Sequence, residues 1–344
     1  MSKQLNKRKA EHIQIVLEEH VTGNEITTGL EQFHFIHNAL PELAFSDIQI
    51  DQTFFSKECK APFLISSMTG GANFAETINR NLATAAEQRG WALALGSTRA
   101  LIESEAYRQS FDLRKYAPTI PIIANLGAVQ LNYGFSVTEC RQIIEYTDAD
   151  ALVLHLNSLQ EVIQPEGNTN FSSLLPKIEN LCAALCIPVG IKEVGWGIDP
   201  SIARQLLDVG ISFIDVAGAG GTSWSQVEKF RTDPIKQRAA AAFSEWGIPT
   251  ARSVEDIAPI ADEKLLIASG GLHTGVDAAK CIALGADFAG FGRSILKEAT
   301  FSVESIIQTM EVRELELRMA MFAVGVQNPN ELQQTNRLQK ITRD

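Results

Sequence analysis

The stretch from Leu265 to Arg293, LLIASGGLHTGVDAAKCIALGADFAGFGR, contains two short apolar segments that each run into glycines. The segments 265–268 and 288–291 have the length and composition of buried strands. Residues 275–284 between them have helical length and stop before Gly285, a residue type that commonly follows a helix. We therefore predict a parallel strand–helix–strand unit in this stretch.

Both predicted strands are followed by glycine, at Gly270-Gly271 and at Gly292, and Arg293 comes directly after the second. Glycine lets backbone N–H groups approach an anion closely, and arginine can bind a phosphate through two parallel hydrogen bonds. In a (β/α)8 barrel, the loops after strands seven and eight commonly bind phosphate. The pattern favours a phosphate site at these loops, although the same glycines could serve only to turn the chain.

The preceding chain supplies six more segments of the same kind. Apolar runs of strand length lie at 63–67, 91–95, 121–124, 151–156, 188–192 and 213–216. Each ends in polar or glycine-rich residues, and helical segments such as 77–90 separate them. Eight strands alternating with helices are the signature of an α/β fold of the (β/α)8 TIM barrel class.

We divide the chain into an N-terminal arm and lead-in (1–56), a barrel (57–298) and a C-terminal helical tail (299–344). The lead-in at 26–52 is typical of a short helix with extended chain, and 302–325 has the apolar spacing of a helix. The segment 225–263 is longer than one helix, so we expect an insertion near the mouth of the barrel.

Composition restricts the class of protein. With 344 residues, of which 45% are hydrophobic, the chain can bury a large core. It contains no apolar run of about eighteen residues and no signal-peptide pattern, so we expect a cytoplasmic protein without a membrane partner. The net charge of −11 disfavours binding to nucleic acid. The five cysteines follow no zinc-site spacing and are expected to be reduced core thiols.

A local basic cluster stands out against this acidic background. It comprises Lys7, Arg8 and Lys9, with His12 close behind. If the arm is helical, Arg8 and His12 lie on one face, four residues apart. On charge pattern alone, a solvated and frayed terminus is the ordinary interpretation.

Polar side chains gather where the predicted strands end, which is where barrel enzymes place catalytic groups. They are Ser67, Thr69, Ser97, Arg99, Asn125, His155, Asn157, Gln160, Glu161, Lys192 and Thr222. No cysteine, Gly-x-Ser-x-Gly motif or close pair of carboxylates accompanies them, which disfavours thiol, serine-hydrolase and glycosidase chemistry. The sequence therefore predicts an enzyme of another class.

Several of these residues have more than one interpretation. Lys192 could form a Schiff base, bind a phosphate or hold its charge against an electron-rich cofactor ring. His155 lies within an apolar strand and could equally be a core histidine. Glu161 could simply stabilise a helix N-terminus, and Thr222 could belong to an ordinary turn.

A set of motifs, from the arm to about Arg293, resembles the type 2, FMN-dependent isopentenyl-diphosphate isomerases. The motifs are RKAEH (8–12), SMTGG (67–71), GSTR (96–99), NLG (125–127), HLNSLQE (155–161), KEVG (192–195), GAGGTSW (218–224) and SGGLHTG (269–275). HLNSLQE and the arm are the specific part, because many FMN barrels share the glycine-rich loops. One departure is Leu272-His273, where an Ile/Val-Arg pair is common in that family.

This resemblance implies an isomerase that interconverts isopentenyl and dimethylallyl diphosphate, with reduced FMN acting as acid and base in an allylic proton shift. It also implies Mg²⁺, NAD(P)H as the flavin reductant, and a homo-oligomer. The alternative on the same fold is an FMN oxidoreductase of the 2-hydroxy-acid oxidase or dihydroorotate dehydrogenase kind. Such enzymes need a titrating base near the flavin, for which only His155 and His273 are candidates.

The resemblance further implies individual roles. FMN would contact Ser67, Met68, Thr69, Ser97, Asn125 and Lys192, and its phosphate would contact Thr222, Gly271, His273, Gly292 and Arg293. The substrate would contact Arg8, Lys9, His12, Ser97, Thr98, Arg99, Asn157 and Gln160. Gln160 and His155 would be the catalytic residues, Glu161 would hold Mg²⁺, and Lys192 would stabilise the anionic reduced flavin.

Overall fold

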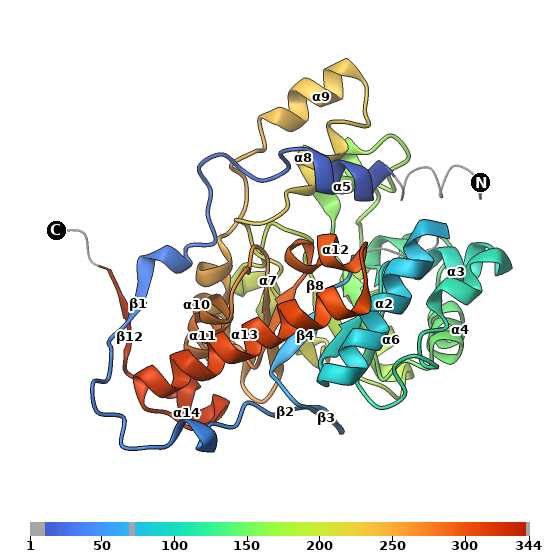
Figure 1. Ribbon diagram of the computed structural model, residues 1–344. Coiled ribbons are helices and arrows are strands. Elements are labelled where there is room, and N and C mark those ends of the chain that lie inside the picture. The colour runs from blue at the N-terminus through green and yellow to red at the C-terminus, as the bar shows by residue number, and fades with distance from the viewer. Residues whose placement is uncertain (1–10, 69–72, 342–344) are drawn as a thin grey trace.

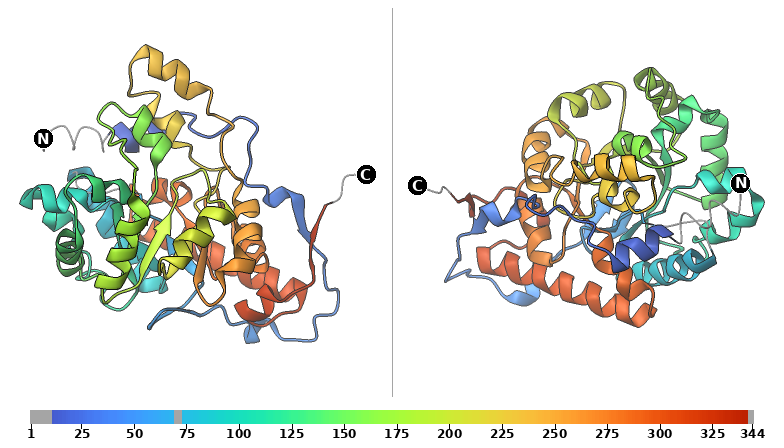
Figure 2. Two further views of the ribbon diagram at one scale, coloured as in Figure 1. Left: turned by 180° about the vertical axis from the view of Figure 1, so that it is seen from behind. Right: turned by 90° about the horizontal axis from the view of Figure 1, so that it is seen from above.

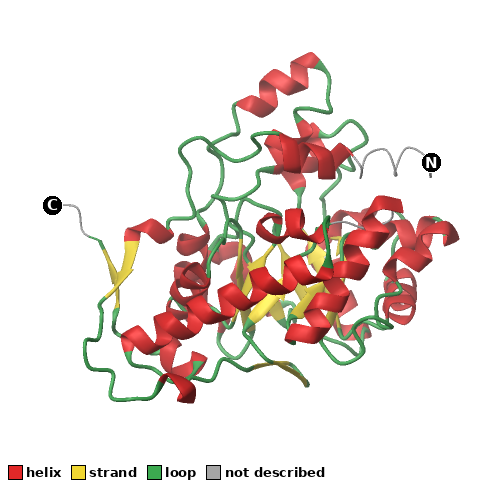
Figure 3. Ribbon diagram, viewed as in Figure 1, coloured by secondary structure: helices red, strands yellow, loops and turns green. Residues whose placement is uncertain are grey.

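A closed barrel of eight parallel strands forms the centre of the molecule, as seen in the computed structural model, which describes residues 11–68 and 73–341. The strands are β4 (Phe63–Ile65), β5 (Ala92–Ala94), β6 (Ile122–Gly127), β7 (Ala151–His155), β8 (Val189–Lys192), β9 (Phe213–Asp215), β10 (Leu265–Ser269) and β11 (Phe288–Phe291). They follow one another in chain order, and β11 pairs with β4 to close the barrel. The predicted (β/α)8 fold is therefore confirmed, and Figure 3 shows the strands enclosed by helices.

A ring of helices surrounds the barrel. It contains α2 (Asn73–Arg89), α3 (Arg99–Glu103), α4 (Val137–Thr147), α6 (Leu174–Ala184), α7 (Pro200–Asp208), α10 (Thr250–Ala261), α11 (Gly275–Ala283) and α13 (Val303–Val324). Local sequence sets several of their ends: Ser136 and Glu139 form a capping box at α4, and Asp199 caps α7 just before a proline. Because α13 packs against both α11 and α2, it completes the ring on its last side (Figure 1).

Further helices lie over the mouth, at the carboxyl ends of the strands. They are a helix over residues 11–18, α5 (Ser158–Ile163), α8 (Trp224–Glu228), α9 (Pro234–Ala241) and α12 (Arg293–Ala299). Seen from above, the helix of the arm lies beside α8 across the barrel opening (Figure 2). The expected insertion is therefore shorter than 225–263, because its last part, α10, is the ordinary barrel helix packed against β10 and α7.

The opposite end of the barrel is closed by a hairpin of β2 (Gln52–Phe54) and β3 (Lys57–Cys59). Phe54 packs its ring against those of Phe213 and Phe288, at centroid distances of 5.8 and 5.4 Å. Inside the barrel, Gly190 makes room for Phe213, since a Cβ at this glycine would lie 2.2 Å from the ring. Aromatic side chains thus fill the lower interior and leave polar groups to the mouth.

Two short strands from distant parts of the sequence pair antiparallel on the outside of the barrel: β1 (Phe33–Phe35) and β12 (Leu338–Lys340). The remaining short elements are η1 (Leu30–Gln32), η2 (Phe45–Asp47), η3 (Glu105–Phe111), η4 (Ala128–Asn132) and α14 (Pro329–Gln333). The division into arm, barrel and tail stays a prediction. Of the helices in residues 11–68 and 73–341, none combines the length and apolar composition needed to span a membrane.

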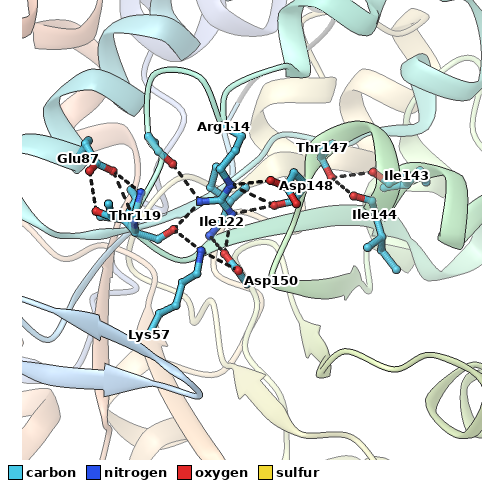
Figure 4. Close-up of polar contacts among 12 residues, drawn as sticks. Lys57, Glu87, Arg114, Thr119, Ile122, Ile143, Ile144, Thr147, Asp148 and Asp150 are labelled. Atoms are coloured by element: carbon cyan, nitrogen blue, oxygen red, sulfur yellow. Dashed lines mark hydrogen bonds and ion pairs between the residues drawn. The ribbon is translucent and has the colours of Figure 1, made fainter.

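Arg114 ties together the loops at the amino ends of the strands (Figure 4). It donates hydrogen bonds to the backbone carbonyls of Ala117, Ile120 and Asp148 and to Oδ2 of Asp150, the last at 2.7 Å. Asp150 also binds Lys57 at 2.8 Å. Removing the guanidinium would therefore leave several partly buried acceptors unpaired.

We expect Arg114→Met to lower the free energy of unfolding by about 2–4 kcal/mol, because hydrogen bonds to charged groups and buried ion pairs have this magnitude when one partner is removed. Chemical denaturation measures the change. Arg252→Met is the matched control, since Arg252 is 60% exposed and forms its ion pair with Asp256, one turn along the same helix. The control should lower the free energy of unfolding by less than about 0.5 kcal/mol. Equal losses of stability in the two variants would show that Arg114 does not stabilise the fold through these contacts.

Candidate active site

A cavity of about 580 Å³ opens at the carboxyl ends of the strands, within the size range of ligand pockets in enzymes. It collects most of the residues that the sequence singled out. Its lining includes His12, Ser67, Met68, Ser97, Arg99, Asn125, His155, Asn157, Gln160, Glu161, Lys192, Thr222, Gly271, His273, Gly292 and Arg293. Residues separated by up to 281 positions, from His12 to Arg293, therefore share one site.

Four of the predicted site residues are not among those lining the cavity. Arg8, Lys9 and Thr69 lie outside the described residues. Thr98 is described but fully buried, and its hydroxyl and N–H both donate to the backbone carbonyl of Asn125 at 2.7 Å. Its side chain thus supports Asn125 from behind and is not positioned to contact a substrate in the cavity.

The loops after β9, β10 and β11 line the cavity, and the first two approach each other so closely that only glycine fits at several of their positions. Gly270 and Gly271 have φ values of 104° and 75°, in the region that favours glycine. A Cβ at Gly221 would lie 2.4 Å from the backbone nitrogen of Gly271. Arg293 lines the same cavity, and the buried hydroxyl of Thr222 has no hydrogen-bond partner among the described residues. The closely spaced backbone of the glycine loops, the guanidinium of Arg293 and the unpartnered hydroxyl of Thr222 are groups that can bind a phosphate.

A row of polar side chains crosses the top of the barrel. His155, Lys192 and Asp215 are direct neighbours in the register of β7, β8 and β9. Lys192 is only 7% exposed, so it places a positive charge at the buried floor of the cavity. Asp215 lies beside Lys192 on the neighbouring strand and accepts a hydrogen bond from Ser269 at 2.6 Å. Burial raises the pKa of Asp215 despite the opposing charge of Lys192.

His155 is held as a neutral side chain. Burial and the charge of Lys192 lower its pKa to about 3. Its Nδ1 lies 2.8 Å from Oδ1 of Asn125, whose amide nitrogen is already used in donating to Leu95. Since Oδ1 accepts, we assign the proton to Nδ1. At neutral pH His155 is therefore a hydrogen-bonding group and a weak base.

Glu228 joins the arm to the mouth of the barrel. Its side chain is completely buried, with Oε1 3.0 Å from Nε2 of His12 and Oε2 2.7 Å from Arg231. Burial alone would raise the pKa of Glu228, but the hydrogen bond and charge of His12, with Gln160 and Arg231, lower it to about 2. Gln160 donates to Oε1 at 3.0 Å. The sequence alone left the role of Glu228 open, since two of its partners, His12 and Gln160, come from distant segments.

Glu161 lies at the opposite edge of this cluster. Its carboxylate accepts hydrogen bonds from Asn157 at 2.9 Å, from Gln164 at 2.6 Å and from the backbone N–H of Asn168 at 2.5 Å. In residues 11–68 and 73–341, no group of three or more His, Cys, Asp or Glu side chains is arranged to hold a metal. A metal at Glu161 would therefore take most of its ligands from substrate and water.

Arg99 is held at the cavity by two partners. Its Nε pairs with Glu103 at 2.5 Å, and its Nη1 donates to the side-chain oxygen of Asn168 at 2.9 Å. The same oxygen accepts a hydrogen bond from Gln130 at 3.1 Å. Asn168 was not predicted, because nothing in the local sequence of its loop distinguishes it from a turn residue.

Comparison with solved structures shows which proteins share this fold. A mandelate oxidase variant with an FMN adduct superposes with a TM-score of 0.67 over 98% of both chains, at 17% identity. A flavocytochrome b2 variant with sulfite bound superposes with a TM-score of 0.71 over 98% of this chain and 85% of its own, at 16% identity. At these identities, the likeness extends to the fold alone.

Sequence comparisons are more specific. Residues 136–339 match the family model described as FMN-dependent dehydrogenase. An isopentenyl-diphosphate delta-isomerase of Oceanobacillus iheyensis is 56% identical over 98% of this chain and 97% of its own length. The enzyme of the same name from a Nostoc species is 45% identical, with 99% and 97% covered. The chain therefore belongs to the family of isopentenyl-diphosphate delta-isomerases.

Proposed function

We propose that this protein interconverts isopentenyl diphosphate and dimethylallyl diphosphate in the cavity at the mouth of the barrel, with FMN as its cofactor. The observation that carries the proposal is the hydrogen-bonded chain from His12 through Glu228 to Gln160. It brings His12 and an uncharged amide, that of Gln160, to the cavity and holds both against a buried, ionised carboxylate behind the lining. An allylic proton shift needs stabilisation of a developing positive charge, which a fixed carboxylate supplies.

The cavity fits FMN in volume and in donor groups. The glycine-rich loops, Arg293 and the unpartnered hydroxyl of Thr222 suit its phosphate, and the hydroxyl of Ser67 is likewise buried without a partner among the described residues. We assign the phosphate to Thr222, Gly271, His273, Gly292 and Arg293, and the ring to Ser67, Met68, Thr69, Ser97, Asn125 and Lys192. When bound and reduced, FMN supplies the group that exchanges a proton with the substrate carbons.

Lys192 would keep a buried positive charge beside the flavin ring and so favour its anionic reduced form. The register of the strands fixes this charge between His155 and Asp215. His155, with a pKa of about 3, would contribute a hydrogen bond and hold Asn125 in place. This low pKa disfavours His155 as the titrating base that the alternative oxidoreductase needs, which leaves His273 as the candidate for that role.

Gln160 would position the reacting part of the substrate. Its Nε2 donates to Glu228 and its Oε1 accepts from Asn157 at 3.2 Å, so both ends of the amide are fixed. An amide does not exchange protons in the working pH range, and its role is therefore to orient the substrate. Glu228 stays ionised, because its pKa of about 2 lies far below neutral pH.

The diphosphate would be bound at the outer side of the cavity. Arg99 and His12 line this side, and Arg8 and Lys9 are the predicted contacts from the arm. Glu161 would hold Mg²⁺ against the diphosphate, because Mg²⁺ is usually bound through one or two carboxylates together with phosphate oxygens and water. The carboxylate of Glu161 is already oriented by Asn157 and Gln164.

We further propose that NAD(P)H serves only to reduce the flavin, because the isomerisation involves no net redox change. We propose a cytoplasmic location from the composition of the sequence, and a homo-oligomer from the resemblance to the isomerase family.

Product analysis after anaerobic incubation of the FMN-reduced protein with isopentenyl diphosphate and Mg²⁺ tests the function. We expect dimethylallyl diphosphate, and a much slower reaction while the flavin is oxidised. In a parallel assay, 2-hydroxy acids should not reduce the flavin. Reduction by such an acid, with no isomer formed, would favour the oxidoreductase alternative.

Glu161→Gln should raise the Mg²⁺ concentration needed for half-maximal activity by about tenfold or more, since it removes the negative charge from a hard-cation ligand. The FMN content should stay unchanged. Titration of activity with Mg²⁺ measures the effect. Glu166→Gln is the control, because Glu166 also lies near the mouth, 3.9 Å from Arg231, without an assigned metal role. The same Mg²⁺ dependence in both variants would argue against Glu161 as a ligand of Mg²⁺.

A further inference from the structure

Arg313 lies on α13 and contacts both loops assigned to the FMN phosphate from the side away from the cavity. It is only 3% exposed. Its Nε donates to the backbone carbonyl of His273 at 3.3 Å, and its Nη2 donates to that of Ser294 at 2.8 Å. His273 lies in the loop after β10, and Ser294 lies in the first turn of α12, directly after the loop that follows β11. Figure 1 shows α13 running past α11 and α12, which those loops lead into.

The two loops and α13 are joined by further contacts. The hydroxyl of Ser294 donates to the carbonyl of Leu272 at 2.9 Å, which connects one loop to the other. Glu316 of α13 accepts a hydrogen bond from the backbone N–H of Gly275 at 2.6 Å. A Cβ at Gly275 would lie 2.1 Å from the carbonyl oxygen of Arg313, so glycine lets the loop approach the helix. Arg313 is thus the centre of a unit that includes both loops.

The guanidinium is also a buried charge without an ion-pair partner among the described residues. Its Nη1 is buried and donates to no hydrogen-bond acceptor in that part of the chain, and the guanidinium carbon lies 4.4 Å from the centre of the Phe291 ring. Burial lowers the pKa of Arg313 to about 10, so the group remains charged at neutral pH. The carboxylate of Asp277, which lies nearby, accepts hydrogen bonds from the backbone N–H groups of His273 and Thr274 and forms no ion pair with Arg313 among the described residues.

We propose that Arg313 is a positioning residue for the FMN phosphate: it fixes the two loops relative to each other and adds a positive charge behind them. The phosphate is an anion in a partly desolvated site. In such a site, a positive charge several ångströms away still attracts the anion and so stabilises its binding. Arg313 would therefore raise the affinity for the phosphate without touching it. This inference rests on the proposed placement of FMN in the cavity.

Exchange of bound FMN for riboflavin on the purified full-length holoprotein tests the proposal. Riboflavin has the same ring but lacks the phosphate, so the ratio of the two flavins bound after dialysis against a known mixture gives the preference for the phosphate. Arg313→Gln keeps a hydrogen-bond donor but removes the charge, and we expect it to reduce the preference roughly tenfold or more. Arg313→Lys keeps the charge and should recover most of that loss.

Arg89→Met is the structural control. Arg89 fastens α13 to α2 through Glu311 at 3.0 Å and through Glu314, and touches neither loop. The Arg89→Met variant should have a lower melting temperature but an unchanged preference for FMN over riboflavin. A wild-type preference in Arg313→Gln, or an equal loss of both flavins, would overturn the proposal. Failure to bind either flavin in the wild-type protein would instead overturn the proposed function.

A second variant covers the case in which Arg313→Gln does not fold. Glu298 lies near Arg313, and its charge raises the pKa of the guanidinium. Glu298→Gln removes this opposing charge and should increase the preference for FMN about two- to threefold, because the field of Arg313 at the phosphate is then less compensated. An unchanged preference in this variant would show that charge behind the loops does not act on the phosphate.

Discussion

Removal of residues 1–12 should leave a folded protein that retains FMN but has a kcat/KM for isopentenyl diphosphate lower by about a thousandfold. The substrate brings several negative charges to a protein of net charge −11, so its binding depends on a local basic cluster. Truncation would remove Arg8, Lys9 and His12 together. It would also deprive Glu228 of its partner at 3.0 Å, and so disturb the carboxylate that fixes Gln160.

Steady-state kinetics, flavin absorbance and thermal unfolding measure these effects together. Removal of residues 1–6 is the matched control, because it spares the basic cluster and should have little effect. Arg8→Ala and Lys9→Ala should each lower kcat/KM about ten- to a hundredfold, as expected for a lost charge-assisted contact. Wild-type kinetics from the protein without residues 1–12 would show that the arm is a frayed terminus with no role in binding.

Lys192→Met should have the second large effect, on the cofactor itself. A unit charge a few ångströms from the reduced flavin is worth about 4 kcal/mol at the effective dielectric of a protein site. We expect weaker retention of FMN, a lower reduction potential, and a kcat lower by roughly a hundred- to a thousandfold. Spectroelectrochemical titration of the flavin and single-turnover kinetics measure these quantities.

The double variant Lys192→Met/Asp215→Asn separates the loss of the cofactor charge from damage to the fold. In the single variant, Asp215 is left as a buried acid without its cationic neighbour, which is destabilising. Neutralising Asp215 should restore thermal stability but not the potential of the flavin. A normal potential in Lys192→Met would mean that Lys192 does not act on the flavin ring.

The barrel strands were predictable because their signals are local. Segment 288–291 coincides with β11, and 213–216 differs from β9 by one residue. A fully buried parallel strand must be apolar along its length, and the chain must turn where it ends, so composition and glycine mark both features. The loops after β10 and β11 were predictable for the same reason, since only glycine adopts the backbone conformation of Gly270 and Gly271 without strain.

Adjacency in the sequence did not reliably predict which residues line the cavity. Thr98 was expected beside Ser97 and Arg99 in contact with the substrate, but its hydroxyl faces the carbonyl of Asn125 in the interior. Adjacent residues at the end of a strand point in different directions, and only the packed structure determines which of them reach the cavity.

The sequence by itself determined the alternation of strands and helices, the glycine-rich loops and the set of polar groups at the strand ends, because each depends on a few neighbouring residues. The tertiary structure alone decided the pairing of Glu228 with His12, the burial of Asp215 beside Lys192 and the position of Arg313 behind the two loops. The physical reason is that the charge of a buried group depends on neighbours brought from distant parts of the chain, and no local pattern encodes that arrangement.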